Sequence, residues 1–153
     1  TQVENDLWFV FTVQEEVGLR GAKPAAWDVQ PDMGIAVDVT RTGDTSGEID
    51  GQRMQVVLGK GPTVKIKDSS VQCNPQVIEH LRKAAKENKI PAQLEILEAG
   101  GTDTSSMQMA GCGSRACAIS VPTRYIHSGV ESCDMGDVEA CIELIEKYVL
   151  LRG

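Results

Sequence analysis

The hydrophobic residues of this chain fall into short runs that polar, glycine-rich stretches separate. Residues 7–13 read LWFVFTV, and residues 33–40 read MGIAVDVT. Short runs rich in β-branched and aromatic residues predict strands that are buried on both faces. The stretch VGLRGAKPAAWDVQ between them predicts a short helix that Pro31 ends. A strand, a crossover helix and a second strand form a βαβ unit, so the two strands are expected to be parallel.

The helix with the clearest signal covers residues 75–89. Asn74 is a good N-cap residue, and Pro75 stands at the first helical position, where its missing N–H costs nothing. Pro91 ends the helix. Its apolar side chains form one stripe, which predicts packing against a sheet: Val77, Ile78, Leu81, Ala84 and Ala85.

The other elements follow from the same patterns. A polar, glycine-rich loop is expected over 41–53, followed by two short strands within 54–66 around a Gly-Lys-Gly-Pro turn. Strands are also expected over 93–97 and 115–122, with a turn and a short helix between them. In the second of these strands, Cys117, Ile119 and Val121 share one face. A last helix is expected over 135–151, with a buried face made of Val138, Ile142, Ile145 and Val149, and with Cys141, Leu144 and Tyr148 beside it.

Alternating strands and helices predict an α/β fold, with a mixed, largely parallel sheet flanked by helices. A chain of 153 residues is long enough for one domain with a sizeable core. Its net charge of −7 disfavours nucleic acid and anionic membranes as partners. No apolar stretch approaches the length of a bilayer span. The five cysteines are odd in number, which predicts reduced thiols in a cytoplasmic protein.

Polar side chains gather where the predicted strands end. Glu15 and Glu16 follow the first apolar run, Asp38 interrupts the second, and His127 follows the strand at 115–122. Sites in open α/β sheets form beyond the carboxyl ends of the strands, so these groups are expected to face one crevice. Carboxylates and imidazole are ligands for zinc, cobalt or manganese. The pattern predicts metal-assisted hydrolysis, in which one glutamate binds metal and its neighbour moves the proton of an activated water to the leaving amine.

Each of these residues also has a plainer explanation. Adjacent glutamates are typical of a solvated turn, Asp38 could pair with Arg20 or Arg41, and most histidines are ordinary surface or core residues. His80 is expected to be solvated on its helix. Two other patterns are weak, because GKGP lacks the spacing of a phosphate-binding loop and the cysteines lack zinc-site spacing. Buried free thiols account better for the cysteines.

Five stretches of the chain, in order, are similar to a known family: FTVQEEVGLRGA, PDMGIAVDVT, LGKGP, EILEAGGTDTSSMQ and SVPTRYIHSGVES. The chain resembles dinuclear metalloaminopeptidases, which include glutamyl, deblocking and tetrahedral TET aminopeptidases, some of them once labelled cellulases or endoglucanases. The resemblance covers nearly the whole chain. It implies an αβα sandwich with an inserted β-barrel domain, two divalent metal ions (zinc or cobalt, with manganese as a third option), peptide substrates and assembly into dodecamers.

The resemblance also implies roles for single residues. Glu15 matches the general base and Glu16 a metal ligand, while Asp38 matches a ligand of the other metal. His127 matches the histidine that holds the first metal together with the equivalent of Glu16. The turn at Gly101, Thr102 and Asp103 lies near the substrate cleft in such enzymes; by local pattern alone, Asp103 is equally well explained as a helix N-cap.

The family takes a further histidine, a bridging aspartate and the β-barrel domain from the half of its chain upstream of the glutamate pair. The sequence begins at Thr1 and has strand-like character from Leu7. We therefore expect residues 1–153 to be the C-terminal part of a catalytic domain, completed by a missing N-terminal segment or a companion chain. A non-catalytic fragment or assembly subunit is the alternative. A glycoside hydrolase fits poorly, since it needs two separated carboxylates beside a groove lined by aromatic residues.

Overall fold

The centre of the structure is a mixed sheet of five strands. The computed structural model describes residues 3–45 and 55–150. The strands are β1 (Met33–Arg41), β2 (Thr63–Lys67), β3 (Gln93–Ile96), β4 (Arg115–Arg124) and β5 (Ser132–Cys133). They lie in the order β1-β4-β2-β3, with β5 paired to β4. The pairs β1–β4 and β2–β3 are parallel, whereas β2–β4 is antiparallel. The predicted α/β class with a mixed sheet is therefore confirmed.

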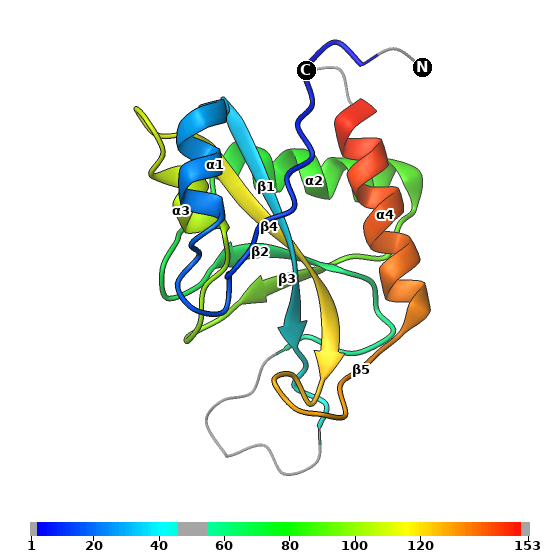
Figure 1. The fold of residues 1–153 in the computed structure, drawn as a ribbon. Helices are drawn as coiled ribbons and strands as arrows, with labels where there is room; N and C mark the ends of the chain where they lie inside the picture. The colour runs from blue at the N-terminus through cyan, green and yellow to red at the C-terminus, as the bar shows by residue number, and fades with distance from the viewer. Residues whose placement is uncertain (1–2, 46–54, 151–153) are drawn as a thin grey trace.

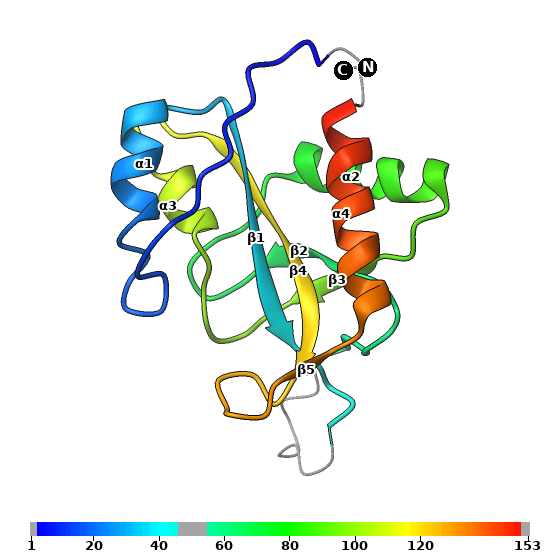
Figure 2. The ribbon, with the colours of Figure 1, turned by 45° about the vertical axis from the view of Figure 1, so that its right-hand side comes forward.

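Four helices cover the sheet: α1 (Ala22–Val29), α2 (Pro75–Asn88), α3 (Thr104–Gln108) and α4 (Met135–Leu150). Figure 2 shows α1 and α3 on one side of the β1–β4 pair and α2 and α4 on the other. The backbone of β1 passes close beneath α3, because a Cβ atom on Gly34 would lie 2.5 Å from the sulfur of Met107. The helices thus form two layers around the sheet.

The hydrophobic core lies between the sheet and the α2–α4 layer. The predicted stripe of α2 is buried there, with Val77, Leu81 and Ala84 almost fully inaccessible. Cys117 and Ile119 face it from β4, as their alternation predicts. The N-cap prediction is also confirmed, since the Asn74 side chain accepts hydrogen bonds from the backbone N–H groups of residues 76 and 77. Each fully buried leucine or valine in such a core stabilises the fold by about 1.5–3 kcal/mol.

The prediction of a strand over residues 7–13 is wrong. The segment runs as extended chain outside the sheet (Figures 1 and 2), and β1 takes β4 as its parallel neighbour instead. Its side chains face solvent, with Trp8 70% exposed and Phe11 94% exposed. The apolar pattern reports a tendency to be buried, but a strand also needs a backbone partner. Within the described residues, no strand pairs with this segment.

The buried face of α4 also differs from the prediction. Ile142, expected inside, is 63% exposed. The buried residues are Asp137, Ala140, Cys141 and Leu144, which stand at positions i, i+3, i+4 and i+7 and form the stripe facing the core. Val138, Ile145 and Val149 are only partly buried. The helix is therefore rotated relative to the expectation, because a purely apolar count gave no weight to a buried aspartate.

Asp137 is buried because it holds the glycine turn before β2. Its carboxylate accepts hydrogen bonds from the backbone N–H of Gly59 at 2.8 Å and of Gly61 at 2.6 Å. Gly61 has φ +88°, and a Cβ atom there would lie 2.1 Å from the Pro91 carbonyl oxygen. The turn is thus fixed to the first turn of α4. The strand expected just before it is absent at residues 55–57, and most of the loop expected over 41–53 lies outside the described residues.

Candidate active site

The two adjacent glutamates sit in a tight turn between residues 13 and 21. The Glu15 carbonyl oxygen accepts from the N–H groups of Gly18 and Leu19, and the Gly21 N–H closes the turn on the Val13 carbonyl at 2.9 Å. A Cβ atom at Gly21 would lie 2.5 Å from the Val13 nitrogen, so only glycine permits this approach. The turn gives the neighbours different surroundings, since Glu15 is partly buried and Glu16 is exposed.

Glu16 lies beside His127. The His127 Nε2 atom is 3.3 Å from the Glu16 Oε2 atom, although the two residues belong to distant parts of the chain. His127 follows β4 and has φ +61°, a conformation uncommon for residues other than glycine. Its backbone N–H donates to the Glu131 carboxylate at 2.5 Å, which holds the loop in this form. The fold therefore brings together the two residues that the family resemblance pairs at one metal.

The carboxyl groups of Asp38 and Glu15 both have a pKa above the ordinary value. Burial raises the pKa of Asp38. Two contacts oppose that rise: the Val39 N–H donates to the carboxylate at 2.7 Å, and Lys65 carries a positive charge. Burial also raises the pKa of Glu15, and the negative charges of Asp38, Glu16 and Asp103 raise it further. These carboxylates therefore lie close enough to repel one another. Such a group of anions favours a bound cation.

Neither Arg20 nor Arg41 forms an ion pair with Asp38 within the described part of the chain. The guanidinium Nε of Arg20 instead donates to the Val17 carbonyl oxygen at 3.1 Å. The simple ion-pair explanation of Asp38 therefore fails for these two arginines. His80, by contrast, is exposed on α2, as expected.

Lys65, Asp68 and Glu95 form a buried ionic network next to the sheet. The Nζ atom of Lys65 lies 3.0 Å from Glu95 and 3.6 Å from Asp68, and all three side chains are inaccessible. Thr40 and Thr63 donate to the two Glu95 oxygens. This network was not predicted from the sequence, although the alternation TVKIK already places Lys65 on the same face as Thr63.

The turn at residues 101–103 contacts the glutamate segment. The Thr12 hydroxyl donates to Asp103 Oδ2 at 2.7 Å. Asp103 stands at the N-cap position of α3, as its local pattern predicts, but its side chain makes no capping hydrogen bond there. Thr102 is buried, with its hydroxyl 2.7 Å from that of Thr104, and Gly101 is exposed. Asp103 thus belongs to the same electrostatic neighbourhood as Glu15 and Asp38.

These residues fit part of a metal site. Two ligands of a tetrahedral zinc ion, each about 2.1 Å from it, lie about 3.4 Å apart. The separation of 3.3 Å between His127 and Glu16 matches two such corners. Over residues 3–45 and 55–150, however, no group of three or more histidine, cysteine, aspartate or glutamate side chains is arranged to hold a metal ion. This part of the chain thus brings one histidine and one carboxylate into contact, with further carboxylates nearby.

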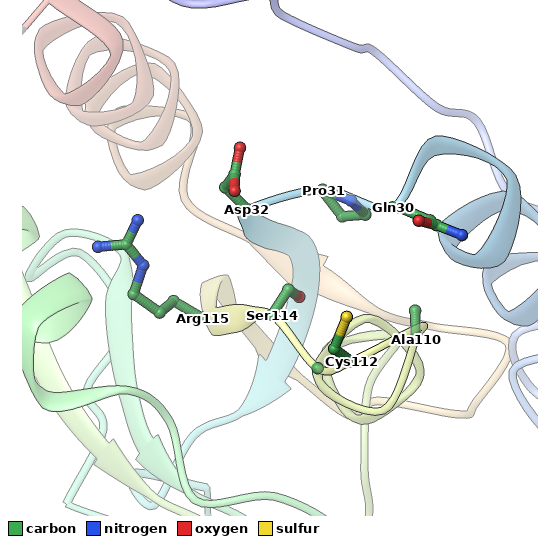
Figure 3. Close-up of a pocket in the computed structure, with 8 residues that line it drawn as sticks. Gln30, Pro31, Asp32, Ala110, Cys112, Ser114 and Arg115 are labelled. Carbon is green, nitrogen blue, oxygen red and sulfur yellow. The ribbon is translucent and has the colours of Figure 1, made fainter.

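A cavity of about 430 Å³ lies elsewhere, at the amino ends of β1 and β4 (Figure 3). Its lining includes Asp32, Cys112, Ser114 and Arg115. Asp38 lies toward the carboxyl end of β1, and His127 follows the carboxyl end of β4. None of the predicted site residues lines this cavity. The predicted site is therefore a group of exposed and partly buried side chains at the other end of the strand pair.

Comparison with known proteins decides the family. The profile of the M42 glutamyl aminopeptidases matches residues 1–144. The chain belongs to the M42 glutamyl aminopeptidase family. Within the described residues of this M42 chain, no helix is both long and apolar enough to cross a membrane.

Relatives of this M42 chain are longer than it is. A candidate aminopeptidase of Acetivibrio thermocellus is 51% identical over 148 residues, which are 97% of this chain and 44% of the relative. The lysyl aminopeptidase of Pyrococcus furiosus is 38% identical over 142 residues, which are 92% of this chain and 39% of the relative. The chain thus spans about two fifths of the length of these relatives.

Solved aminopeptidases share the fold. An aminopeptidase from the archaeon Desulfurococcus kamchatkensis superposes with a TM-score of 0.85 at 39% identity, over 90% of this chain and 39% of that one. The Pyrococcus horikoshii TET1 peptidase, which can assemble into a tetrahedron or a large octahedral shell, superposes with a TM-score of 0.75 at 35% identity. That match covers 91% of this chain and 39% of the TET1 chain. The predicted sandwich fold is therefore confirmed.

Proposed function

We propose that this chain is the part of a metal-dependent aminopeptidase that carries its general base and several metal ligands. The observation that supports this most is the contact of Glu16 with His127 at 3.3 Å. Glu16 and His127 would hold one divalent ion and Asp38 the other. Zinc, cobalt and manganese all accept these ligand types, so the ions are proposed to be zinc or cobalt, with manganese as a third option. When bound, the ions would supply Lewis acidity toward water and the peptide carbonyl.

Glu15 is the proton-transfer residue in this proposal. It adjoins a proposed ligand yet lies in a different, partly buried environment. Its raised pKa brings proton affinity closer to what a general base needs near neutral pH. Glu15 would take a proton from the attacking water and deliver it to the leaving amine. The turn at Gly101, Thr102 and Asp103 would border the bound peptide.

A companion polypeptide segment would complete the site. Three observations support it: residues 7–13 expose apolar side chains, β1 lies at the edge of the sheet, and Val37 and Val39 on that strand are exposed. Surfaces of this kind usually mark an interface. The relatives' greater length is consistent with a segment that covers it. Assembly as a homo-oligomer of the dodecamer class is proposed by analogy with a second TET1 structure, which is a dodecamer. A cytoplasmic location agrees with five free cysteines.

A non-catalytic assembly subunit is the second candidate function. It is favoured by the lack of a three-ligand group in residues 3–45 and 55–150. The two candidates differ in metal content and in hydrolysis, so a single preparation can separate them.

The decisive experiment measures intact mass and metal content on the same purified sample, followed by hydrolysis of aminoacyl-anilide substrates. The aminopeptidase proposal expects about two metal ions per complex and a companion fragment. Glu15→Gln should then abolish hydrolysis while metal stays bound. Glu143→Gln, a matched change on the exposed face of α4, should leave both hydrolysis and metal binding unchanged. A single 16.5 kDa species without metal or activity would contradict the aminopeptidase proposal and favour the non-catalytic alternative, a fragment or an assembly subunit.

A further inference from the structure

The loop that carries His127 connects β4 to β5 (Figure 1). These two strands pair antiparallel, and Arg124, the last residue of β4, lies opposite Ser132, the first residue of β5. Glu131 directly precedes Ser132, so its backbone adjoins a position that the sheet fixes. The Glu131 side chain is exposed and reaches back across the loop. Glu131 is therefore attached to a firmer part of the fold than the histidine that it contacts.

His127 has an unfavourable backbone conformation in this loop. Its φ is +61°, and Tyr125, two residues earlier, has φ +57°. Residues other than glycine lose energy in the left-handed region, because their Cβ atom crowds the neighbouring carbonyl oxygen. Such residues persist only where the surrounding structure holds them. The conformation of His127 therefore needs a contact that compensates for this cost.

Glu131 supplies such a contact. Its Oε1 atom accepts the hydrogen bond of the His127 backbone N–H at 2.5 Å. A carboxylate is a stronger acceptor than a neutral carbonyl group, which is why bonds to it are short. The two other side-chain hydrogen bonds of the loop are longer and do not reach His127. They join the Val130 N–H to the Ser128 hydroxyl at 3.3 Å and the Ser132 hydroxyl to the Val130 carbonyl oxygen at 3.4 Å.

We propose that Glu131 is the positioning residue of His127: its carboxylate holds the His127 backbone at positive φ and so keeps the imidazole beside Glu16. A change in φ moves the Cβ atom and the ring, so a released backbone would carry Nε2 away from the Glu16 oxygen that it now approaches at 3.3 Å. The inference rests on the proposed function, in which these two side chains share one metal ion. Polar groups behind a metal-binding histidine usually orient it through the second ring nitrogen. Here the control acts through the backbone.

The first test needs no metal. It measures nuclear Overhauser contacts between the His127 ring and the Glu16 side chain in the metal-free protein as isolated. The unsubstituted protein should show them, and Glu131→Ala should lose them. Glu131→Gln should retain them, because its amide oxygen can still accept from the His127 N–H. Glu139→Ala, a matched change at an exposed position of α4, should retain them as well.

The second test measures zinc affinity by calorimetry on the same variants. Glu131→Ala should lower the affinity by about tenfold or more, as the loss of an orienting partner does. Glu131→Gln should stay within about threefold of the unsubstituted protein, since the acceptor is kept. Urea denaturation establishes that each variant is folded under these conditions. If Glu131→Ala does not fold, Glu131→Asp replaces it, because the shorter side chain keeps the charge but withdraws the oxygen from the N–H.

Three results would overturn the inference. The ring contact could be missing from the unsubstituted protein, Glu131→Ala could retain it, or zinc affinity could stay unchanged although the contact is lost. Failure of the proposed function has a different signature. If the unsubstituted protein binds no zinc but shows a ring contact that depends on Glu131, the positioning role holds and only the proposed metal site falls.

Discussion

The His127 imidazole and the Glu16 carboxylate meet at 3.3 Å in a chain that carries them on two separate loops. If they form a ligand pair, removing either one should weaken metal binding. We expect His127→Asn to reduce zinc affinity by at least about 10–100-fold, as changes around metal ligands do. Zinc titration followed by calorimetry measures this. His80→Asn is the matched control, because His80 is exposed on α2. Equal affinities for the two variants would contradict the assignment of His127.

Asp38 should destabilise the metal-free protein at neutral pH. Its folded-state pKa is raised by burial, so ionisation is harder in the folded state than in the unfolded state. Stability is therefore lost as pH rises through the raised pKa. Asp38→Asn can still accept from the Val39 N–H without this cost, and we expect it to raise the free energy of unfolding at pH 7 by about 0.5–1 kcal/mol.

The gain from Asp38→Asn should shrink as pH falls below the pKa of Asp38, because the native carboxyl group is then neutral as well. Urea denaturation at several pH values, with added chelator, measures this. Asp28→Asn on α1 serves as the exposed control. A gain that is the same at low and neutral pH would show that the charge of Asp38 is not its source.

Asp137→Ala should be strongly destabilising. It removes the acceptor of two backbone N–H groups, those of Gly59 and Gly61, and leaves them without that partner beside a buried turn. We expect a loss of about 2–4 kcal/mol in the free energy of unfolding, since both hydrogen bonds are to a charged group. Glu143→Ala, on the exposed face of the same helix, should change stability by less than about 0.5 kcal/mol. Comparable losses would mean that the turn is held by other contacts.

Gly21→Ala tests whether the glutamate turn depends on the close approach to Val13. The added methyl group would meet backbone atoms at 2.5 and 2.7 Å, so the turn must open. We expect a destabilisation of about 1–3 kcal/mol. Gly129→Ala is the matched change, because nothing lies within 4 Å of a Cβ atom there. If Gly21→Ala proves as mild as Gly129→Ala, the turn is less constrained than its geometry indicates.

Lys65→Met should leave Glu95 and Asp68 as buried, unpaired anions. Breaking a buried pair in this way costs about 3–5 kcal/mol of stability. Lys83→Met, at an exposed position of α2, should have little effect. Because the charge of Lys65 also lowers the pKa of Asp38, the variant should raise that pKa further. The pKa of Asp38 can be measured by NMR titration. An unchanged pKa in the Lys65→Met variant would contradict the link between the network and the site.

Local signals predicted most elements of the fold. The prediction of α2 was accurate because its N-cap, its proline and its apolar stripe all act within one segment. The error at residues 7–13 has a different origin, because strand formation depends on a partner that a pattern cannot supply. The buried face of α4 was misjudged because Asp137 binds backbone groups more than seventy positions away, a contact with no local signature.

The candidate site was predictable only in part. Strand-end placement correctly located Asp38 and His127, whereas for Glu16 the strand on which the argument rested is absent. Family motifs supplied the proposed roles of all three residues. Neither the pattern nor the motifs revealed the hydrogen bond from Thr12 to Asp103. Threonine and aspartate on separate loops are too common for their pairing to be recognised before the loops are folded.

The exposure of both tryptophans determines how this protein can be observed. Trp8 and Trp27 are 70% and 59% exposed, so their indoles are already hydrated in the folded chain. Emission wavelength should therefore change little on unfolding, and the denaturation curves above need circular dichroism. Trp8 lies on the segment proposed to be covered by the companion chain. Because its emission wavelength responds little to unfolding, that wavelength can be used to follow binding of the companion chain. A shift to shorter wavelength on mixing with a candidate companion chain would report the docking event itself, with almost no contribution from folding.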